Sequence, residues 1–447
     1  MQSIFGTDGI RGKFNLDITC SLASELGYAL AKTSTSNDPI LIGRDTRVSG
    51  NFLFEALTVG INSANKEVVD LGICPTPAVP ILIKKLPFSN GVMISASHNP
   101  PEYNGIKIFN SEGKKLDKSE ELLLEQFLKK KEKIKVCHKD IKYKLNKFEL
   151  LKMYEDSLIT ASDNESLSGL KIILDTCHGS ASVCAEKVFK KLGAEVIVIN
   201  NSIDGTKINV DCGSTNLKPI KQAISANDAD MGFSFDGDAD RVIGIDSKGN
   251  TLDGDHILFL WGRELMKEKK LSKNILISTL MANLGFEQHW KDIGGQFYRT
   301  AVGDKFIYEE ILKKKADLGG EQSGHILSKM NDYCGDGILT AIQIAKYCKK
   351  NKISLDNWLD TSFQAFPQKL TNLEFPAELR KSYKDIDLRI NQIVQETLHQ
   401  TKEPCRILIR PSGTEPLLRI LVEAQNKKLV EMFSIKIEMD LKKVIYS

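Results

Sequence analysis

The same order of local sequence patterns occurs three times in this chain, and this repetition constrains the fold more than any other feature. Each copy has a short apolar run, a polar loop, a stretch with helical periodicity and a second apolar run. The copies begin near Pro39, Leu170 and Asn274, and in the second of them Gly193 stands where the helix is expected to end. Strand, helix and strand in this order form a βαβ unit, which places functional loops at the carboxyl ends of parallel strands. The repeats therefore predict three related α/β domains.

The C-terminal part of the chain has a different pattern. A helical stretch precedes two apolar runs, CRILIR and LLRILVEA, which the turn-forming sequence PSGTEP joins, and a last helix follows. Strands joined by a short turn favour an antiparallel α+β domain. We therefore expect four domains in the 447 residues, at 1–150, 151–254, 255–368 and 369–447. The predicted fold class is α/β, with three related α/β domains plus a C-terminal α+β domain.

Composition gives the expected partners and compartment. The chain has 61 basic and 58 acidic residues, a net charge of +3, which gives no reason to expect nucleic acid as the main partner. Its nine cysteines include no C-x-x-C pair, so neither a disulfide framework nor a zinc site is expected. No apolar run approaches the roughly 18 residues that span a bilayer, and the sequence MQSIFGTDGIRGKF lacks a signal-peptide pattern. We expect a cytoplasmic protein without a membrane partner.

Three aspartates form the sharpest chemical signal. The sequence FSFDGDADRV places Asp236, Asp238 and Asp240 at alternate positions directly after an apolar run. Carboxylates this close repel one another unless a cation neutralises them, and oxygen ligands of this kind suit Mg²⁺. An acidic surface turn is the plain alternative, whereas an EF-hand loop is not supported because its glycine and glutamate positions are absent. We predict a magnesium site at these three residues.

A second polar loop contains a candidate nucleophile. In GVMISASHNPPEYNGIKIF an apolar run ends in a loop rich in turn-forming residues, which presents its side chains instead of burying them. Ser97 is the candidate nucleophile, and a nearby divalent cation would organise a phosphoryl group on it. The adjacent His98 is a candidate base. Taken alone, a serine in a polar loop is in most cases only part of an ordinary turn.

Two further motifs predict binding of phosphate and sugar. The sequence RPSGTEPLLR combines a glycine, hydroxyl groups and two arginines, which suit a phosphate, although a simple hairpin explains it too. The sequence GGEQSGHI displays side chains suited to sugar hydroxyls, with an ordinary turn as the alternative. The candidate residues are Arg410, Ser412, Gly413, Thr414 and Arg419 in the first motif, and Glu321, Gln322, Ser323 and His325 in the second.

Together with the opening FGTDGIRG, these four motifs resemble the α-D-phosphohexomutase superfamily in order and approximate spacing along the whole chain. The resemblance implies four domains around a central cleft. It also implies that Ser97 is a phosphoserine, whose phosphate completes a Mg²⁺ site with Asp236, Asp238 and Asp240. Cys177 and His178 stand in DTCHGSAS, where relatives commonly have a different sequence.

The resemblance also implies roles for the other motif residues. Arg11 and Lys107 match positions of proton transfer and charge stabilisation, and we choose Lys107 as the general base. Because Arg11 and Arg241 were expected to flank it, we predict a depressed pKa for Lys107. Glu321, Ser323 and His325 match the loop that faces the sugar. The residues matched to the phosphate that is not transferred are Arg410, Ser412, Gly413, Thr414 and Arg419.

The implied reaction is the movement of a phosphoryl group between two positions of one sugar, through a bisphosphate. By resemblance, Gln322 in GEQSGH favours a hexosamine phosphate as substrate, whereas relatives acting on glucose or mannose phosphates often have an aromatic residue there. The activator implied by the resemblance is hexosamine 1,6-bisphosphate. The product is expected to feed UDP-N-acetylglucosamine and cell-wall precursor synthesis. A mutase for glucose or mannose phosphates, a Mg²⁺-dependent sugar phosphatase and a non-catalytic sensor are the alternatives. A monomer or a homodimer is expected.

Overall fold

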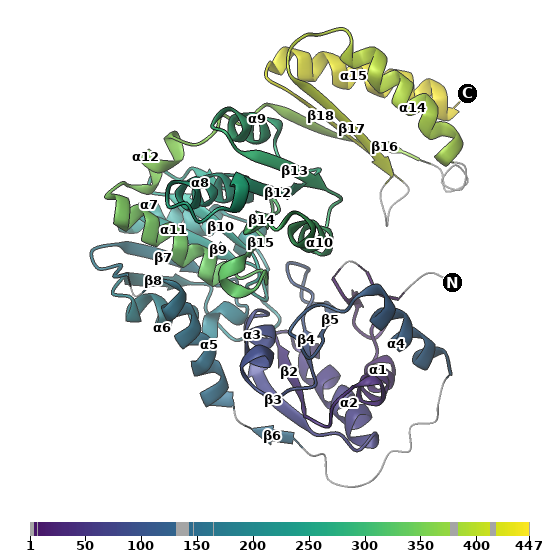
Figure 1. The fold of residues 1–447 in the computed structure, drawn as a ribbon, viewed down its shortest axis with the longest axis vertical. Helices are drawn as coiled ribbons and strands as arrows, with labels where there is room; N and C mark the ends of the chain where they lie inside the picture. The colour runs from purple at the N-terminus through teal and green to yellow at the C-terminus, as the bar shows by residue number, and fades with distance from the viewer. Residues whose placement is uncertain are drawn as a thin grey trace. The chain divides into compact units, whose positions relative to one another are not determined.

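The computed structural model describes residues 4–6, 8–130, 143–145, 147–163, 165–375, 383–411 and 417–446 (Figure 1). The chain divides into two compact units. We call the part made of Met1–Met281 and Gln296–Ser362 the large unit, and the part made of Ala282–Gly295 and Phe363–Ser447 the small unit. The large unit contains three β-sheets and the small unit contains one.

The first sheet of the large unit has six strands in the order β1-β5-β4-β2-β3-β6. The inner strands are parallel, while β5 runs antiparallel to both β4 and β1. The strands are β1 (Ile10–Lys13), β2 (Ile40–Arg44), β3 (Val68–Ile73), β4 (Asn90–Ile94), β5 (Tyr103–Phe109) and β6 (Tyr143–Leu145). The helices are α1 (Cys20–Thr33), α2 (Ser49–Ser63), α3 (Ala78–Lys85) and α4 (Lys118–Lys130).

The second sheet has five strands in the order β11-β10-β9-β7-β8, with a parallel half and an antiparallel half. The strands are β7 (Lys171–Asp175), β8 (Glu195–Ile199), β9 (Met231–Phe235), β10 (Val242–Asp246) and β11 (Thr251–Leu252). The helices are α5 (Lys147–Ala161), η1 (Ser180–Val183), α6 (Ala185–Lys191), η2 (Gly213–Thr215) and α7 (Lys218–Asn227).

The third sheet has four strands in the order β13-β12-β14-β15. They are β12 (Ile275–Thr279), β13 (Gln296–Thr300), β14 (Leu318–Gly320) and β15 (Ile326–Ser328). The helices are α8 (Gly254–Lys267), η3 (Ser272–Asn274), α10 (Asp304–Lys314), η4 (Lys329–Asn331), α11 (Gly337–Asn351) and α12 (Leu355–Asp360). Side chains cap the starts of three of these helices: Asp253 accepts from the His256 amide, Ser328 from the Met330 amide and Asp336 from the Leu339 amide.

The small unit has an antiparallel sheet in the order β16-β18-β17. Its strands are β16 (Gln368–Glu374), β17 (Cys405–Pro411) and β18 (Leu417–Ala424), and its helices are α9 (Leu284–Asp292), α14 (Tyr383–Leu398) and α15 (Lys427–Tyr446). Strand β16 was not predicted, because its residues QKLTNLE are mostly polar and, in the sheet, mostly exposed or half-buried.

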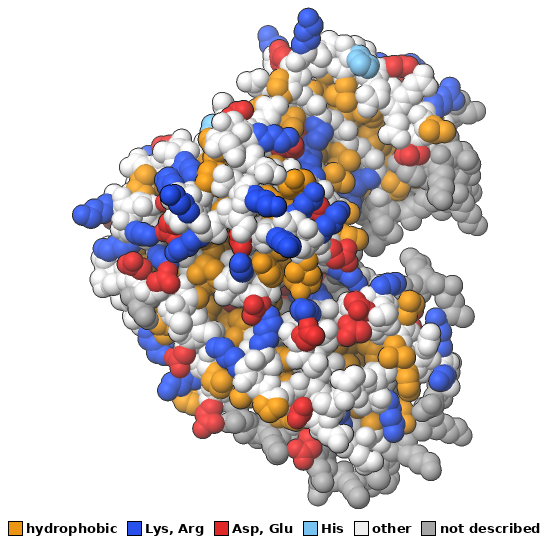
Figure 2. Space-filling model, in the orientation of Figure 1, with side chains coloured by type: hydrophobic (Ala, Val, Ile, Leu, Met, Phe, Trp, Pro, Cys, Tyr) orange, Lys and Arg blue, Asp and Glu red, His pale blue; other side chains and the backbone are white. Residues whose placement is uncertain are grey.

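The predicted fold class is confirmed: three α/β domains and a C-terminal α+β domain form the four-domain architecture. All three sheets of the large unit are mixed, since each contains both parallel and antiparallel strand pairs. The proposed domain boundaries and the central cleft stay predictions. On the face shown in Figure 2, side chains of both charges are interspersed over the large unit. Within the described ranges, none of the helices combines the length and apolar character needed to cross a bilayer.

The topology explains why the motifs lie in loops. Ser97 follows β4, Asp236 follows β9 and Glu321 follows β14, so each motif begins where a strand ends. Each of these strands lies inside its sheet, with a neighbouring strand on both sides. Buried strands hold their ends in fixed positions, and the polar loops that follow them are free to carry chemistry.

Helices α1 and α2 pack closely because glycines stand at their contact. A Cβ atom at Gly60 would lie 1.9 Å from the carbonyl oxygen of Ser24, and one at Gly27 would lie 2.4 Å from that of Leu57. We expect Gly60→Val to lower the free energy of unfolding of the large unit by about 3 kcal/mol, because the helices must separate to accept the side chain. Urea denaturation measures this loss. Glu55→Val, on the exposed side of α2, is the control, and an equal loss in both variants would contradict this account.

Candidate active site

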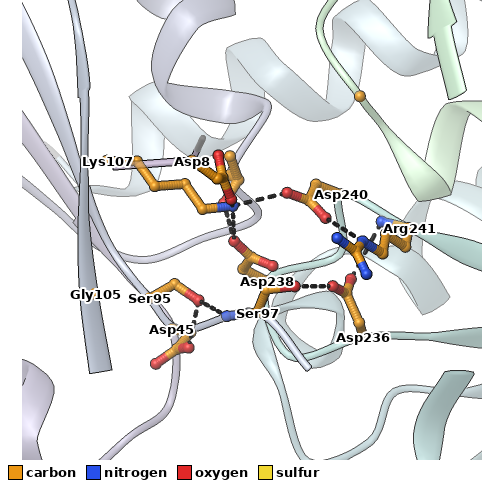
Figure 3. A network of polar contacts seen from close by, with 12 residues as sticks. Asp8, Asp45, Ser95, Ser97, Gly105, Lys107, Asp236, Asp238, Asp240 and Arg241 are labelled. Atoms are coloured by element: carbon orange, nitrogen blue, oxygen red, sulfur yellow. Dashed lines mark hydrogen bonds and ion pairs between the residues drawn. The ribbon is translucent and has the colours of Figure 1, made fainter. Parts of the chain in front are cut away.

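Ser97 is buried in a constrained loop at the end of β4. Only 1% of its surface is exposed, and its backbone has a left-handed conformation with φ of 53°. The Ser97 amide donates to Ser95 Oγ at 2.9 Å, and the Ser97 hydroxyl donates to Asp236 Oδ2 at 2.6 Å (Figure 3). The structure therefore brings the candidate nucleophile of the first domain into contact with the acidic loop of the second.

The three aspartates converge as the sequence predicts. Asp236, Asp238 and Asp240 are all buried, and one carboxylate oxygen from each lies within 4.8 Å of the others. Ala239 takes a left-handed conformation with φ of 56°, which turns the loop back on itself. A Cβ atom at Gly237 would lie 2.6 Å from the carbonyl oxygen of Ser97, so only glycine lets the two loops approach this closely.

The residues of this loop fit a divalent cation. Asp238 Oδ1 is buried and receives no hydrogen bond from any residue that the structure describes. Burial, together with the charges of Asp240 and Asp238, raises the pKa of Asp236 well above its usual value. A buried carboxylate oxygen without a hydrogen-bond partner is costly, and an oxygen-only donor set suits Mg²⁺. The three aspartates would hold the ion.

Lys107 is the cation that already faces these carboxylates. Its side chain is 2% exposed, and Nζ lies 2.8 Å from Asp240, 2.9 Å from Asp238 and 3.0 Å from Asp8. Burial lowers the pKa of Lys107, but the attraction of the three carboxylates outweighs it and places the pKa well above its usual value. The predicted depressed pKa is therefore wrong, because carboxylates and not arginines are the nearest charges.

Arg11 and Arg241 contact the site from two sides. The antiparallel pairing of β1 with β5 places Arg11 opposite Gly105, two residues from Lys107. Arg11 donates to Asp8 Oδ2 at 3.0 Å and to Asn99 Oδ1 at 3.2 Å. Arg241 Nη1 lies 3.2 Å from His98 Nδ1, and Ser97 Oγ lies at the same distance from that atom. Burial and the arginine charges lower the pKa of His98 to about 4, so His98 is neutral at pH 7.

The third domain contributes His325 and Glu321. His325 Nδ1 lies 3.4 Å from Asp240 and Nε2 lies 3.6 Å from Asp304. Burial lowers the pKa of His325, but these carboxylates raise it more. Glu321 is buried and accepts from the Gly303 amide at 3.1 Å, whereas Ser323 is exposed. The structure thus joins His325 directly to the acidic loop and holds Glu321 in the same hairpin.

In the small unit, the two arginines of the predicted phosphate motif are direct neighbours. Arg410 on β17 is paired with Arg419 on β18. Burial and the charge of Arg419 lower the pKa of Arg410. Like charges opposite each other in a sheet are unfavourable, and a bound anion would relieve them. Ser412, Gly413 and Thr414 lie outside the described residues.

Asp8 and Asp304 belong to the site but are not among the residues predicted from the sequence. Asp8 forms ion pairs with Arg11, Lys107 and Lys115, and Lys115 also pairs with Asp304. Asp8 stands in the quoted FGTDGIRG motif, so its charge was visible there. No spacing in the sequence links Asp304 to His325, because the contact exists only after the third domain folds.

Comparison with known proteins identifies the family of this chain. Four domain families described as phosphoglucomutase/phosphomannomutase match in order: domain I at residues 2–135, domain II at 152–249, domain III at 253–366 and the C-terminal domain at 368–435. The chain belongs to the phosphoglucomutase/phosphomannomutase family. It is 60% identical over 438 residues to a phosphoglucosamine mutase of Prochlorococcus marinus strain MIT 9312, covering 98% of this chain and 97% of that protein.

Two solved structures share the fold of this chain. A phosphoglucomutase/phosphomannomutase family protein of Burkholderia thailandensis matches with a TM-score of 0.80 at 21% identity, over 99% of this chain and 98% of that one. The Aspergillus fumigatus N-acetylphosphoglucosamine mutase, in complex with GlcNAc-6P and magnesium, matches with a TM-score of 0.63 at 17% identity, over 99% and 96%.

The acidic loop predicts a stabilising effect of Mg²⁺. At a concentration 100 times the dissociation constant, the ion is expected to stabilise the folded chain by about 2.7 kcal/mol, seen as a higher melting temperature that EDTA reverses. Asp238→Asn removes one charge and should abolish most of this shift. Asp360→Asn, an exposed aspartate at the end of α12, is the control. An unchanged Mg²⁺ shift in Asp238→Asn would contradict the assignment.

Proposed function

We propose that this chain is a phosphoglucosamine mutase, an intramolecular phosphotransferase that interconverts glucosamine 6-phosphate and glucosamine 1-phosphate. The observation that carries the proposal is the 2.6 Å hydrogen bond from the buried Ser97 hydroxyl to Asp236, within a cluster of three aspartates. The names of relatives 60% identical to the chain give the substrate class. The product then feeds UDP-N-acetylglucosamine and cell-wall precursor synthesis.

The proposed cycle begins with phosphorylated Ser97. The bond between phosphorus and Ser97 Oγ breaks as a bond forms to the sugar oxygen; the proton of the attacking sugar hydroxyl passes to a neighbouring base, and Ser97 Oγ takes up a proton. The bisphosphate then turns, the Ser97 hydroxyl loses its proton as the other phosphoryl group moves to its Oγ, and the sugar oxygen left behind takes up a proton. The enzyme is regenerated in its phosphorylated form, so hexosamine 1,6-bisphosphate is the expected activator.

The charges around Ser97 suit this chemistry. Mg²⁺ bound by Asp236, Asp238 and Asp240, with a phosphate oxygen of Ser97, would withdraw charge from the transferring phosphoryl group. Lys107 and Arg11 supply further positive charge. Because Asp238, Asp240 and Asp8 raise the pKa of Lys107, this lysine must lose a proton before it serves as the predicted base.

Substrate binding is assigned to the other motifs. His325 lies next to the acidic loop and is proposed as a catalytic group facing the sugar, with Glu321 and Ser323 binding hydroxyls. The proposed phosphate-binding residues of the small unit are Arg410, Ser412, Gly413, Thr414 and Arg419. The cytoplasmic location and a monomeric or homodimeric state stay predictions.

Substrate choice is tested by direct comparison. With Mg²⁺ and the matching bisphosphate, the chain should convert glucosamine 6-phosphate with a higher kcat/KM than glucose 6-phosphate or mannose 6-phosphate, measured as formation of the 1-phosphate. A preference for glucose or mannose phosphate would favour a phosphoglucomutase or phosphomannomutase. Steady release of inorganic phosphate would favour a phosphatase, and complete inertness a sensor.

Removal of the nucleophile tests the phosphoserine. Ser97→Ala is expected to lose nearly all mutase activity, at least about a thousandfold, because the route through a covalent intermediate disappears. Intact mass should show one phosphoryl group on the wild-type chain after incubation with bisphosphate and none on the variant. Ser21→Ala, exposed on α1, is the matched control. Near-normal turnover of Ser97→Ala would remove Ser97 from the mechanism.

A further inference from the structure

Two side chains hold the backbone carbonyl of Ser97, and one of them comes from another domain. Arg47 Nη2 donates to the Ser97 carbonyl oxygen at 2.9 Å, and Asn209 Nδ2 donates to the same atom at 2.8 Å. Asn209 lies between β8 and η2 of the second domain, 112 positions from Ser97. A carbonyl oxygen only accepts hydrogen bonds, so the amide nitrogen of Asn209, and not its amide oxygen, faces Ser97.

The same two donors also hold the carbonyl of Asn99. Arg47 Nη2 lies 2.7 Å from this oxygen and Asn209 Nδ2 lies 3.0 Å from it. Arg47 and Asn209 therefore hold the loop by hydrogen bonds on both sides of His98. The side-chain amide nitrogen of Asn209 has two hydrogens, and both donate to carbonyl oxygens of this loop.

Arg47 is anchored within the first domain. It is 2% exposed, and its Nε donates to Asp45 Oδ2 at 2.9 Å. The same oxygen accepts from Ser95 Oγ at 2.7 Å, and Ser95 Oγ in turn accepts from the Ser97 amide. Asp45 thus fixes both the amide and, through Arg47, the carbonyl of Ser97, which holds the residue in its left-handed conformation.

Asn209 is anchored within the second domain. Its backbone is left-handed, with φ of 60°, and its amide donates to the carbonyl of Cys177 at 3.1 Å. A Cβ atom at Gly237 would lie 3.0 Å from Asn209 Nδ2, so the acidic loop packs directly against this amide. The position of Asn209 is therefore set by the domain that carries Asp236, Asp238 and Asp240.

From these contacts we infer that Asn209 is a positioning residue, which fixes the Ser97 loop relative to the acidic loop. The inference rests on the proposed function, since Ser97 must be aligned with both the aspartates and the sugar. Phosphoryl transfer depends on alignment, and a displacement of about 1 Å costs on the order of a hundredfold in rate. Asn209 acts through the backbone of Ser97, so its loss should affect kcat and leave KM unchanged.

The test uses Asn209→Asp and Asn209→Gly in the full-length chain. Aspartate has the same shape without the donors, and glycine removes the side chain, and both tolerate a left-handed backbone. We expect each variant to reduce kcat by about tenfold to a hundredfold, with KM for glucosamine 6-phosphate within twofold of the wild-type value. Phosphorylation of Ser97 by the bisphosphate should slow similarly. Amide hydrogen exchange of residues 97–100 should be faster.

Lys207→Ala is the control, because this lysine stands two positions earlier in the same segment and is exposed. Its kcat and its exchange in residues 97–100 should match those of the wild type. If both Asn209 variants keep the kcat and the hydrogen-exchange rates of the wild type, the inference is overturned. A change in KM without a change in kcat would also overturn it. If the wild-type chain converts no sugar phosphate, the proposed function fails, whereas the exchange measurement still decides whether Asn209 holds the loop.

Discussion

The structure depends on the burial of three carboxylates at one place. Asp236, Asp238 and Asp240 lie next to one another with almost no exposure, and this arrangement is stable only where positive charge is supplied. Lys107 supplies it from the first domain, and the oxygen ligands are suited to a dication as well. The need to balance this charge brings the loops of three domains together, which also explains why a net charge of +3 says little about where the chain binds anions.

The charges form a connected network and not a set of separate pairs. Asp8 joins Arg11, Lys107 and Lys115, while Asp304 joins Lys115 and His325. Groups coupled in this way titrate together, so the protonation state of one group depends on the protonation states of the others. Substrate, phosphate or cation entering such a site changes the pKa of several side chains at once. Proton transfer in the proposed cycle can therefore be controlled by what is bound.

The sequence predicted most of the site because its chemistry is concentrated in short motifs. Ser97 and Asp236 lie in loops that follow β4 and β9, and apolar runs made the ends of these two strands visible. Glu321 follows β14, whose sequence LGG has no such run. The errors have physical causes. The polar strand β16 lacks the apolar pattern that identifies a strand. The predicted direction of the pKa shift of Lys107 was wrong because the nearest charged groups come from distant parts of the chain. The role of Asn209 was not predicted, because an asparagine in a loop does not by itself indicate which group it contacts.

By itself, the sequence determined the residue types at the site, their order along the chain and the repeated units that carry them. Only the tertiary structure decided which groups are neighbours and in which protonation state they stand. The reason is that hydrogen bonds and ion pairs act over about 3 Å, whereas their partners are far apart in sequence. Lys107 meets Asp240 across 133 positions and Asn209 meets Ser97 across 112. Local periodicity contains no information about such contacts.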